Sequence, residues 1–151
     1  MGLSNAEFEN ILTDTSKCIE GDISWQLDED HSPCVDFRAE VTSSPGWPLF
    51  VRGSLNRLIG AVSFVLILKT VGRIYALDLG KDHHNPQCDF VGDCHKHRWT
   101  ERFRDKEAYC PQDITADPAN PTEVWRQFCE EARISHRGVL HAVPDAQREL
   151  F

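Results

Sequence analysis

The stretch that decides the fold begins with the apolar run Leu58-Ile-Gly-Ala-Val-Ser-Phe-Val-Leu-Ile-Leu68, turns through Lys69-Thr-Val-Gly72 and returns as Arg73-Ile-Tyr-Ala-Leu-Asp-Leu79. Both arms are rich in β-branched and aromatic residues, and a glycine at position 72 lets the turn adopt a positive φ. The stretch therefore predicts a β-hairpin. Its first arm, Ala61–Leu68, is apolar on both faces, which is typical of a central strand. A buried helix is the competing interpretation, but the short length favours a strand.

Three segments before the hairpin are also predicted to be strands. Ile23–Leu27 and Val35–Val41 alternate apolar and polar residues, which indicates strands with one wet face. Leu49–Leu55 is a third candidate, weakened by Gly53. With the hairpin arms, these segments predict an antiparallel meander of about five strands.

Two helices are predicted at the ends of the chain. Ser4 and Glu7 form a capping box ahead of a helix over Asn5–Cys18. Asn120 is positioned to cap a second helix over Pro121–Arg133, with proline at its first position. The fold class is therefore predicted to be α+β, with both helices packed on one face of the sheet.

Length and composition favour a single domain. The 151 residues with 40% hydrophobic content suit one well-filled core, expected over residues 1–137. Residues 138–151 are expected to form a loosely held tail. The net charge of −8 argues against non-specific coating of DNA, so any nucleic acid would have to bind a local basic patch.

Cysteine usage and hydropathy suggest a cytoplasmic protein without a membrane partner. The apolar run is too short to span a bilayer, and no secretory signal is visible. We therefore expect the six cysteines, none of them in a C-x-x-C pair, to be reduced thiols: Cys18, Cys34, Cys88, Cys94, Cys110 and Cys129.

The segment after the hairpin concentrates imidazoles and thiols, namely His83, His84, Cys88, Cys94, His95 and His97. In an extended chain, His95 and His97 share one face, whereas Cys94, Lys96 and Arg98 share the other. Two imidazoles on one face can act as an acid and base pair near neutral pH, or meet one phosphate or one metal. Arg73, on the neighbouring arm, is expected at the same edge.

Two further readings of this segment stay open. A basic cluster beside the histidines predicts an anion site at Lys96, Arg98, Arg102 and Arg104. Alternatively, Cys88, Cys94, His95 and His97 could bind zinc, although their spacing matches no common zinc signature. A shared metal would also need a bulge at Cys94. A merely solvated loop remains the plain alternative.

A set of short motifs resembles the TumE type of small bacterial toxin, a component of toxin–antitoxin modules. The motifs are Arg73-x-Tyr75-x-x-Asp78, His83 with Asn85, His95-Lys-His97-Arg-Trp99 and Tyr109, and the resemblance covers Val62–Ile134. It implies a bacterial or phage protein, ribonuclease-like and neutralised by a partner. By matching residues, it implies functional roles for Arg73, His95 and His97.

Two hypotheses of function follow. The first is a ribonuclease-like toxin or defence protein that needs no cofactor. His97 would be the general base on a ribose 2′-hydroxyl and His95 the general acid, while Arg73 and Arg98 hold the phosphate charge. RNA and an acidic antitoxin would be its partners. The second hypothesis is a zinc-stabilised interaction module without catalysis, and the zinc content of the purified protein separates the two.

Overall fold

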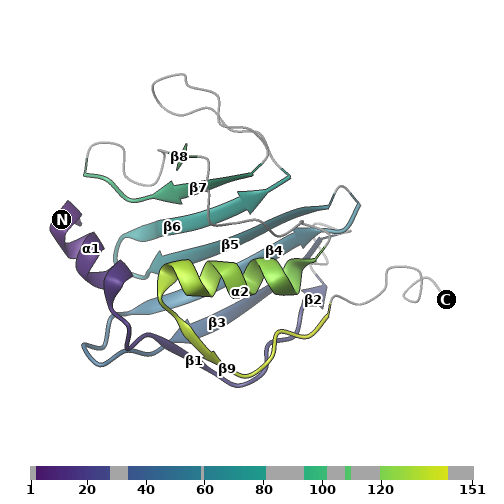
Figure 1. The fold of residues 1–151 in the computed structure, drawn as a ribbon, viewed down its shortest axis with the longest axis horizontal. Helices are drawn as coiled ribbons and strands as arrows, with labels where there is room; N and C mark the ends of the chain where they lie inside the picture. Colours follow the sequence, from purple (N-terminus) through teal and green to yellow (C-terminus); the bar gives the residue numbers. More distant parts are fainter. Residues whose placement is uncertain are drawn as a thin grey trace.

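The computed structural model describes residues 3–27, 34–58, 60–80, 94–101, 108–109 and 120–142, with the backbone alone at 94–97 and 108–109. It is an α+β protein, as predicted, built on one large antiparallel sheet (Figure 1). The strands follow one another in chain order: β2 (Gln26–Leu27), β3 (Cys34–Val41), β4 (Leu49–Asn56), β5 (Ala61–Leu68), β6 (Gly72–Leu79), β7 (Cys94–Arg98) and β8 (Ala108–Tyr109). The predicted five-strand meander corresponds to β2–β6.

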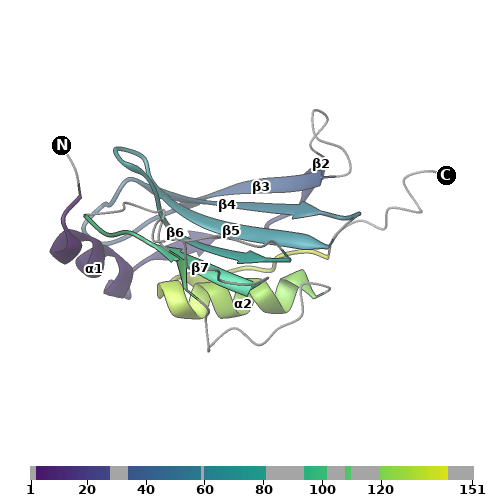
Figure 2. The same cartoon turned by 90° about the horizontal axis from the view of Figure 1, so that it is seen from above.

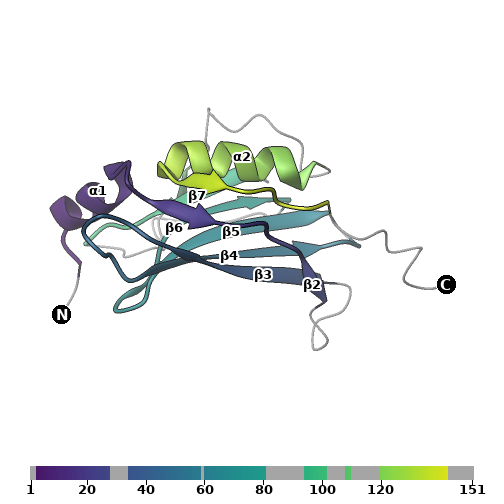
Figure 3. The same ribbon diagram turned by 90° about the horizontal axis from the view of Figure 1, so that it is seen from below.

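The remaining elements lie on one side of this sheet. Helices α1 (Asn5–Thr13) and α2 (Pro121–Ala132) are both on that side (Figures 2 and 3), which confirms the predicted layering. Two short strands, β1 (Cys18–Glu20) and β9 (Ser135–Arg137), pair in parallel as a separate two-stranded sheet. The predicted helix caps are confirmed: Ser4 forms the capping box, and the Asn120 side chain accepts from the backbone of Glu123.

An aromatic cluster joins α2 to the sheet. The Trp125 ring lies 5.1 Å from the Phe64 ring and 5.5 Å from the Phe37 ring, centre to centre. Phe128 packs on Phe64 and on Tyr75, each at 5.7 Å. Such contacts combine a large buried apolar area with favourable ring geometry. They identify the face of the sheet that α2 covers.

A buried lysine ends α1. The Lys17 side chain is fully buried, and its Nζ donates to the carbonyls of Ile11, Leu12 and Asp14 at 2.6–2.9 Å. The ammonium therefore satisfies carbonyl groups that the helix leaves without partners at its C-terminal end. Burial lowers the pKa of Lys17 to about 8.

The boundaries at both ends of the chain correct the expectations from sequence. The first helix ends at Thr13, not near Cys18, and Cys18–Glu20 is a strand. Only Gln26–Leu27 of the strand predicted over Ile23–Leu27 joins the large sheet. Residues 138–141 are not a loose tail, because the backbone of Ile23 bonds to that of Val139 and His141 at 2.9 Å and Leu140 is buried. Residues 143–151 lie outside the described part.

The expectations about cysteines and membranes can be compared with the structure only for the described residues. The thiols described there, those of Cys18, Cys34 and Cys129, are free. Neither helix in these residues is long and apolar enough to cross a membrane.

Gly53 makes room for the aromatic cluster and gives the first testable prediction. It pairs directly with Phe37, and a Cβ built at Gly53 would lie 2.2 Å from the Phe37 ring. We expect Gly53→Ala to lower the free energy of unfolding by about 1–3 kcal/mol, because overpacking forces the ring to move. Urea denaturation measures the loss. In a double-mutant cycle, Gly53→Ala should cost much less free energy of unfolding in a Phe37→Leu background than in the parent. If the two losses of stability simply add, the clash with the Phe37 ring is not the cause.

Candidate functional site

The side of the sheet opposite the helices carries the predicted site residues. Paired positions in neighbouring strands share a face, so the register defines rows that cross the sheet. Phe37, Phe64 and Tyr75 contact α2, and the positions alternating with them therefore belong to the helix-free face. Three rows of this face are Glu40–Phe50–Ile67–Arg73, Arg38–Arg52–Val65–Ala76–His97 and Asp36–Ser54–Ser63–Asp78–His95.

Strand β7 brings the two histidine positions into these rows. His95 pairs with Asp78, and His97 pairs with Ala76. The register between β6 and β7 continues without interruption to Leu79 and Cys94. The positions of His95 and His97 are therefore on the helix-free face, as the predicted alternation requires.

A buried carboxylate lies in the same row as His95. Asp78 is 8% exposed and Ser63 is 6% exposed, and the Ser63 hydroxyl donates to the Asp78 carboxylate. A buried carboxylate needs hydrogen-bond donors to offset its lost hydration. In a directly opposed antiparallel pair, Cβ atoms lie about 4.5–5.5 Å apart. Asp78 is therefore paired in register with position 95, a neighbourhood that the sequence alone did not indicate.

Arg73 is on the helix-free face as well. It pairs with Ile67 next to a register shift between Leu66 and Ile67. Because of this β-bulge, Arg73 shares a face with Ala76 although the two are three residues apart. Arg73 is thus separated from the row of His97 by roughly 10 Å of strand, a distance that a long side chain can partly bridge. The predicted trio of Arg73, His95 and His97 is on one face.

Arg98, one of the predicted anion-binding residues, lies on the helix-bearing face. It pairs with Tyr75, which faces α2, and its guanidinium forms an ion pair with Glu9 of α1 at 2.6 Å. The same guanidinium lies 5.5 Å from the centre of the Phe8 ring. Arg98 therefore supports the docking of α1 and does not share the face of the histidine positions. Lys96, paired with Leu77, belongs to the same helix-bearing face by its register. Arg102 and Arg104 lie outside the described residues.

Arginines that the sequence analysis did not select are on the helix-free face. Arg38 and Arg52 pair directly across β3 and β4. The Arg38 guanidinium lies 3.8 Å above the centre of the Phe50 ring, and Arg52 is 3.5 Å from Asp36. The alternation of apolar and polar residues could have indicated that both arginines lie on the solvent-facing side of their strands. Their proximity to the histidines depends on strand order, which local patterns do not give.

The register bears on the zinc hypothesis, which stays a prediction. Cys94 occupies a regular position in β7, so it belongs to the face opposite His95 and His97. A tetrahedral site that includes all three residues would need a bulge, and the β6–β7 ladder has none at Cys94. Within the described side chains, no group of three or more histidine, cysteine or acidic residues is placed to hold a metal. Cys88 lies outside the described residues.

Comparison with known proteins gives one family. The family model DUF6978, described as a family of unknown function, matches residues 3–134, a range that includes all of α1 and α2. No curated protein and no solved structure matches the chain.

Arg98 gives the second prediction. We expect Arg98→Gln to lower the free energy of unfolding by no more than about 1 kcal/mol, because both partners of its ion pair with Glu9 are partly exposed to solvent. We also expect it to leave phosphate and nucleic-acid binding unchanged, because it is on the helix-bearing face. Urea denaturation and a binding titration measure the two effects. A large loss of anion binding in a folded Arg98→Gln variant would show that Arg98 takes part in the anion site.

Proposed function

The chain belongs to the DUF6978 family of unknown function, and for this member we propose cleavage of RNA phosphodiesters at the helix-free face of the sheet, as a ribonuclease-like toxin or defence protein. The observation that carries the proposal is the uninterrupted register between β6 and β7. It puts the positions of His95 and His97 on one face, together with Arg73 and Asp78. The resemblance of the same residues to TumE-type toxins supports it too.

The proposed chemistry uses the spacing of the two histidines. Positions i and i+2 of a strand are about 7 Å apart on one face, so two imidazoles there can approach a phosphate from different sides. His97 takes the proton of the ribose 2′-hydroxyl, and the 2′-oxygen then attacks the adjacent phosphorus. His95 gives a proton to the departing 5′-oxygen, which leaves a 2′,3′-cyclic phosphate and a free 5′-hydroxyl. Arg73 offsets the charge that develops on the phosphate.

Asp78 has a positioning role in this proposal. A carboxylate beside an imidazole fixes its tautomer and stabilises the protonated form, which is the form that a general acid requires. Asp78 is held by Ser63 and pairs in register with His95. An acidic antitoxin segment would inhibit the protein by covering the same face.

The histidines provide the direct test. We expect His95→Ala and His97→Ala each to reduce cleavage of a labelled RNA by about 100-fold or more, the usual contribution of acid–base catalysis. Urea denaturation should show little loss of stability. His141→Ala is a matched control, because that imidazole is exposed and lies 3.3 Å from Asp22, outside the rows that hold the positions of His95 and His97. A folded His97→Ala variant with full activity would refute the assignment.

The same variants test the zinc hypothesis. Stoichiometric zinc in the purified protein, lost together with stability in His97→Ala, would favour a metal-stabilised module, because metal binding is coupled to folding.

Asp78 gives a separate prediction. We expect Asp78→Asn to lower the cleavage rate and to move the alkaline limb of the pH–rate profile to lower pH, because the imidazolium of His95 loses a neighbouring negative charge. Denaturation curves must accompany the profile, since Asp78 is buried. A lower rate with an unchanged profile would indicate a purely structural role.

A further inference from the structure

We propose that the helix-free face between β3 and β6 is a binding track for single-stranded RNA. In this track, Phe50 and Arg38 stack on a base, and Arg52 contacts a phosphate. The inference deepens the proposed function and takes its substrate class from it. The track itself depends on described side chains in β3 and β4, away from the histidine positions in β7.

The charge of this face supports a polyanionic ligand. The chain has a net charge of −8. On the part of the helix-free face that the structure describes, the cations Arg38, Arg52, Lys69 and Arg73 nonetheless gather beside the carboxylates of Asp36, Glu40 and Asp78. One of the three, Asp78, is buried. A local cationic surface on an acidic protein directs an anion to that surface.

The direct pairing of Arg38 with Arg52 also favours an anionic ligand. Like charges at directly opposed positions of a sheet destabilise it. Each guanidinium keeps one carboxylate neighbour at the long end of the ion-pair range, Arg38 with Glu40 at 3.4 Å and Arg52 with Asp36 at 3.5 Å. Glu40 is shared with Lys69 at 2.6 Å, and this hydrogen bond holds the pKa of Glu40 below its usual value. A phosphate between the two arginines would relieve their repulsion.

Phe50 supplies the feature that distinguishes RNA from a simple anion. Its ring is partly exposed on the helix-free face, and the Arg38 guanidinium covers it at 3.8 Å. Single-stranded RNA binds through unpaired bases that stack on aromatic rings and on guanidinium planes. The Phe50–Arg38 pair offers both surfaces at one place. More than half of the Arg38 side chain is exposed, so a base can reach it.

The rows give the track its direction. One continuous row is formed by Arg38, Arg52, Val65, Ala76 and His97. It crosses the neighbouring strands β3, β4, β5, β6 and β7, whose order can be followed in Figure 1. Four strand spacings of about 4.8 Å each place Arg38 roughly 19 Å from the His97 position. Ala76 in this row is fully buried, so the accessible part of the track is the arginine pair with Phe50, and the row gives only the direction from there to the histidine positions.

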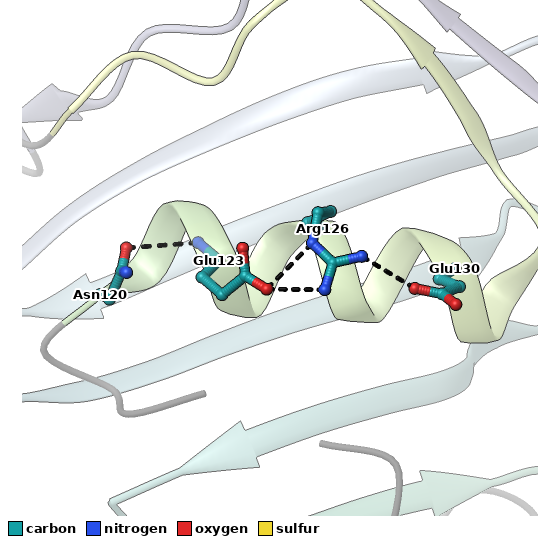
Figure 4. Close-up of polar contacts among 4 residues, drawn as sticks. All are labelled: Asn120, Glu123, Arg126 and Glu130. Atoms are coloured by element: carbon teal, nitrogen blue, oxygen red, sulfur yellow. Dashed lines mark hydrogen bonds and ion pairs between the residues drawn. The ribbon is translucent and has the colours of Figure 1, made fainter. Parts of the chain in front are cut away.

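The opposite side of the molecule supplies a matched control. Arg126 lies on the outer surface of α2, where its guanidinium contacts Glu123 at 2.6 Å and Glu130 at 3.0 Å (Figure 4). The side chains of Arg126 and Arg52 are both 59% exposed. Arg126→Gln thus removes the same charge at the same exposure from the helix-bearing side.

Fluorescence anisotropy with a 12-nucleotide 2′-O-methyl RNA measures binding without cleavage, because the attacking hydroxyl is blocked. We expect Arg52→Gln to weaken binding several-fold and to reduce the slope of log K against log salt by about one. Phe50→Leu should weaken binding by about fivefold or more and leave the salt slope unchanged. Arg126→Gln should bind as the parent does. All variants should keep the parent's urea midpoint to within a small shift.

Other outcomes would overturn the track. It fails if the parent does not bind the RNA at low salt, if Arg126→Gln weakens binding as much as Arg52→Gln, or if the face binds a polyglutamate peptide and not RNA. The last result would identify an acidic protein as its partner. RNA binding that depends on Arg52 and Phe50, without cleavage of unmodified RNA, would refute the proposed function and leave the track standing. Cleavage of RNA that neither Arg52→Gln nor Phe50→Leu changes would refute the track and leave the proposed function standing.

Discussion

The packing of α2 against one face of the sheet is the constraint on which the rest of the structure depends. The rings of Trp125 and Phe128 cover Phe37, Phe64 and Tyr75, so alternate positions of β3, β5 and β6 must be apolar. The positions between them are left on a face that no described helix covers. Strict alternation along the strands therefore separates the core from the polar chemistry of the same strands.

Local patterns explain how well the fold could be predicted. Val35–Val41 was identified from its alternation and Ala61–Leu68 from its unbroken apolar run, and the strands follow these segments closely. The prediction was wrong where structure depends on distant partners. Cys18–Glu20 is a strand because it pairs with a segment at the other end of the chain, and a three-residue strand has no period of its own. The burial of Leu140 likewise depends on Ile23, which no local pattern indicates.

The candidate site was predictable to a different extent. The histidine positions and Arg73 could be grouped from the sequence, because the spacing within one strand and one hairpin is local information, and their role as a site stays a prediction. Arg98 was grouped with them by closeness in sequence, yet an odd offset in a strand puts it on the opposite face, where Glu9 pairs with it. Arg38 was overlooked for the converse reason, since it is far from the histidines in sequence and reaches their face only through strand order.

The parallel pairing of β1 with β9 has a consequence for how the chain acquires its fold during synthesis. The meander consists of hairpins, whose contacts are local and can form as soon as each strand emerges. The ion pair between Glu20 and Arg137 instead joins residues 117 positions apart. The meander must therefore wait for the last fifth of the chain before α2 covers its apolar face. During that interval the apolar face that includes Phe37 and Phe64 lacks its cover, and transiently exposed apolar surface of this kind favours aggregation in general.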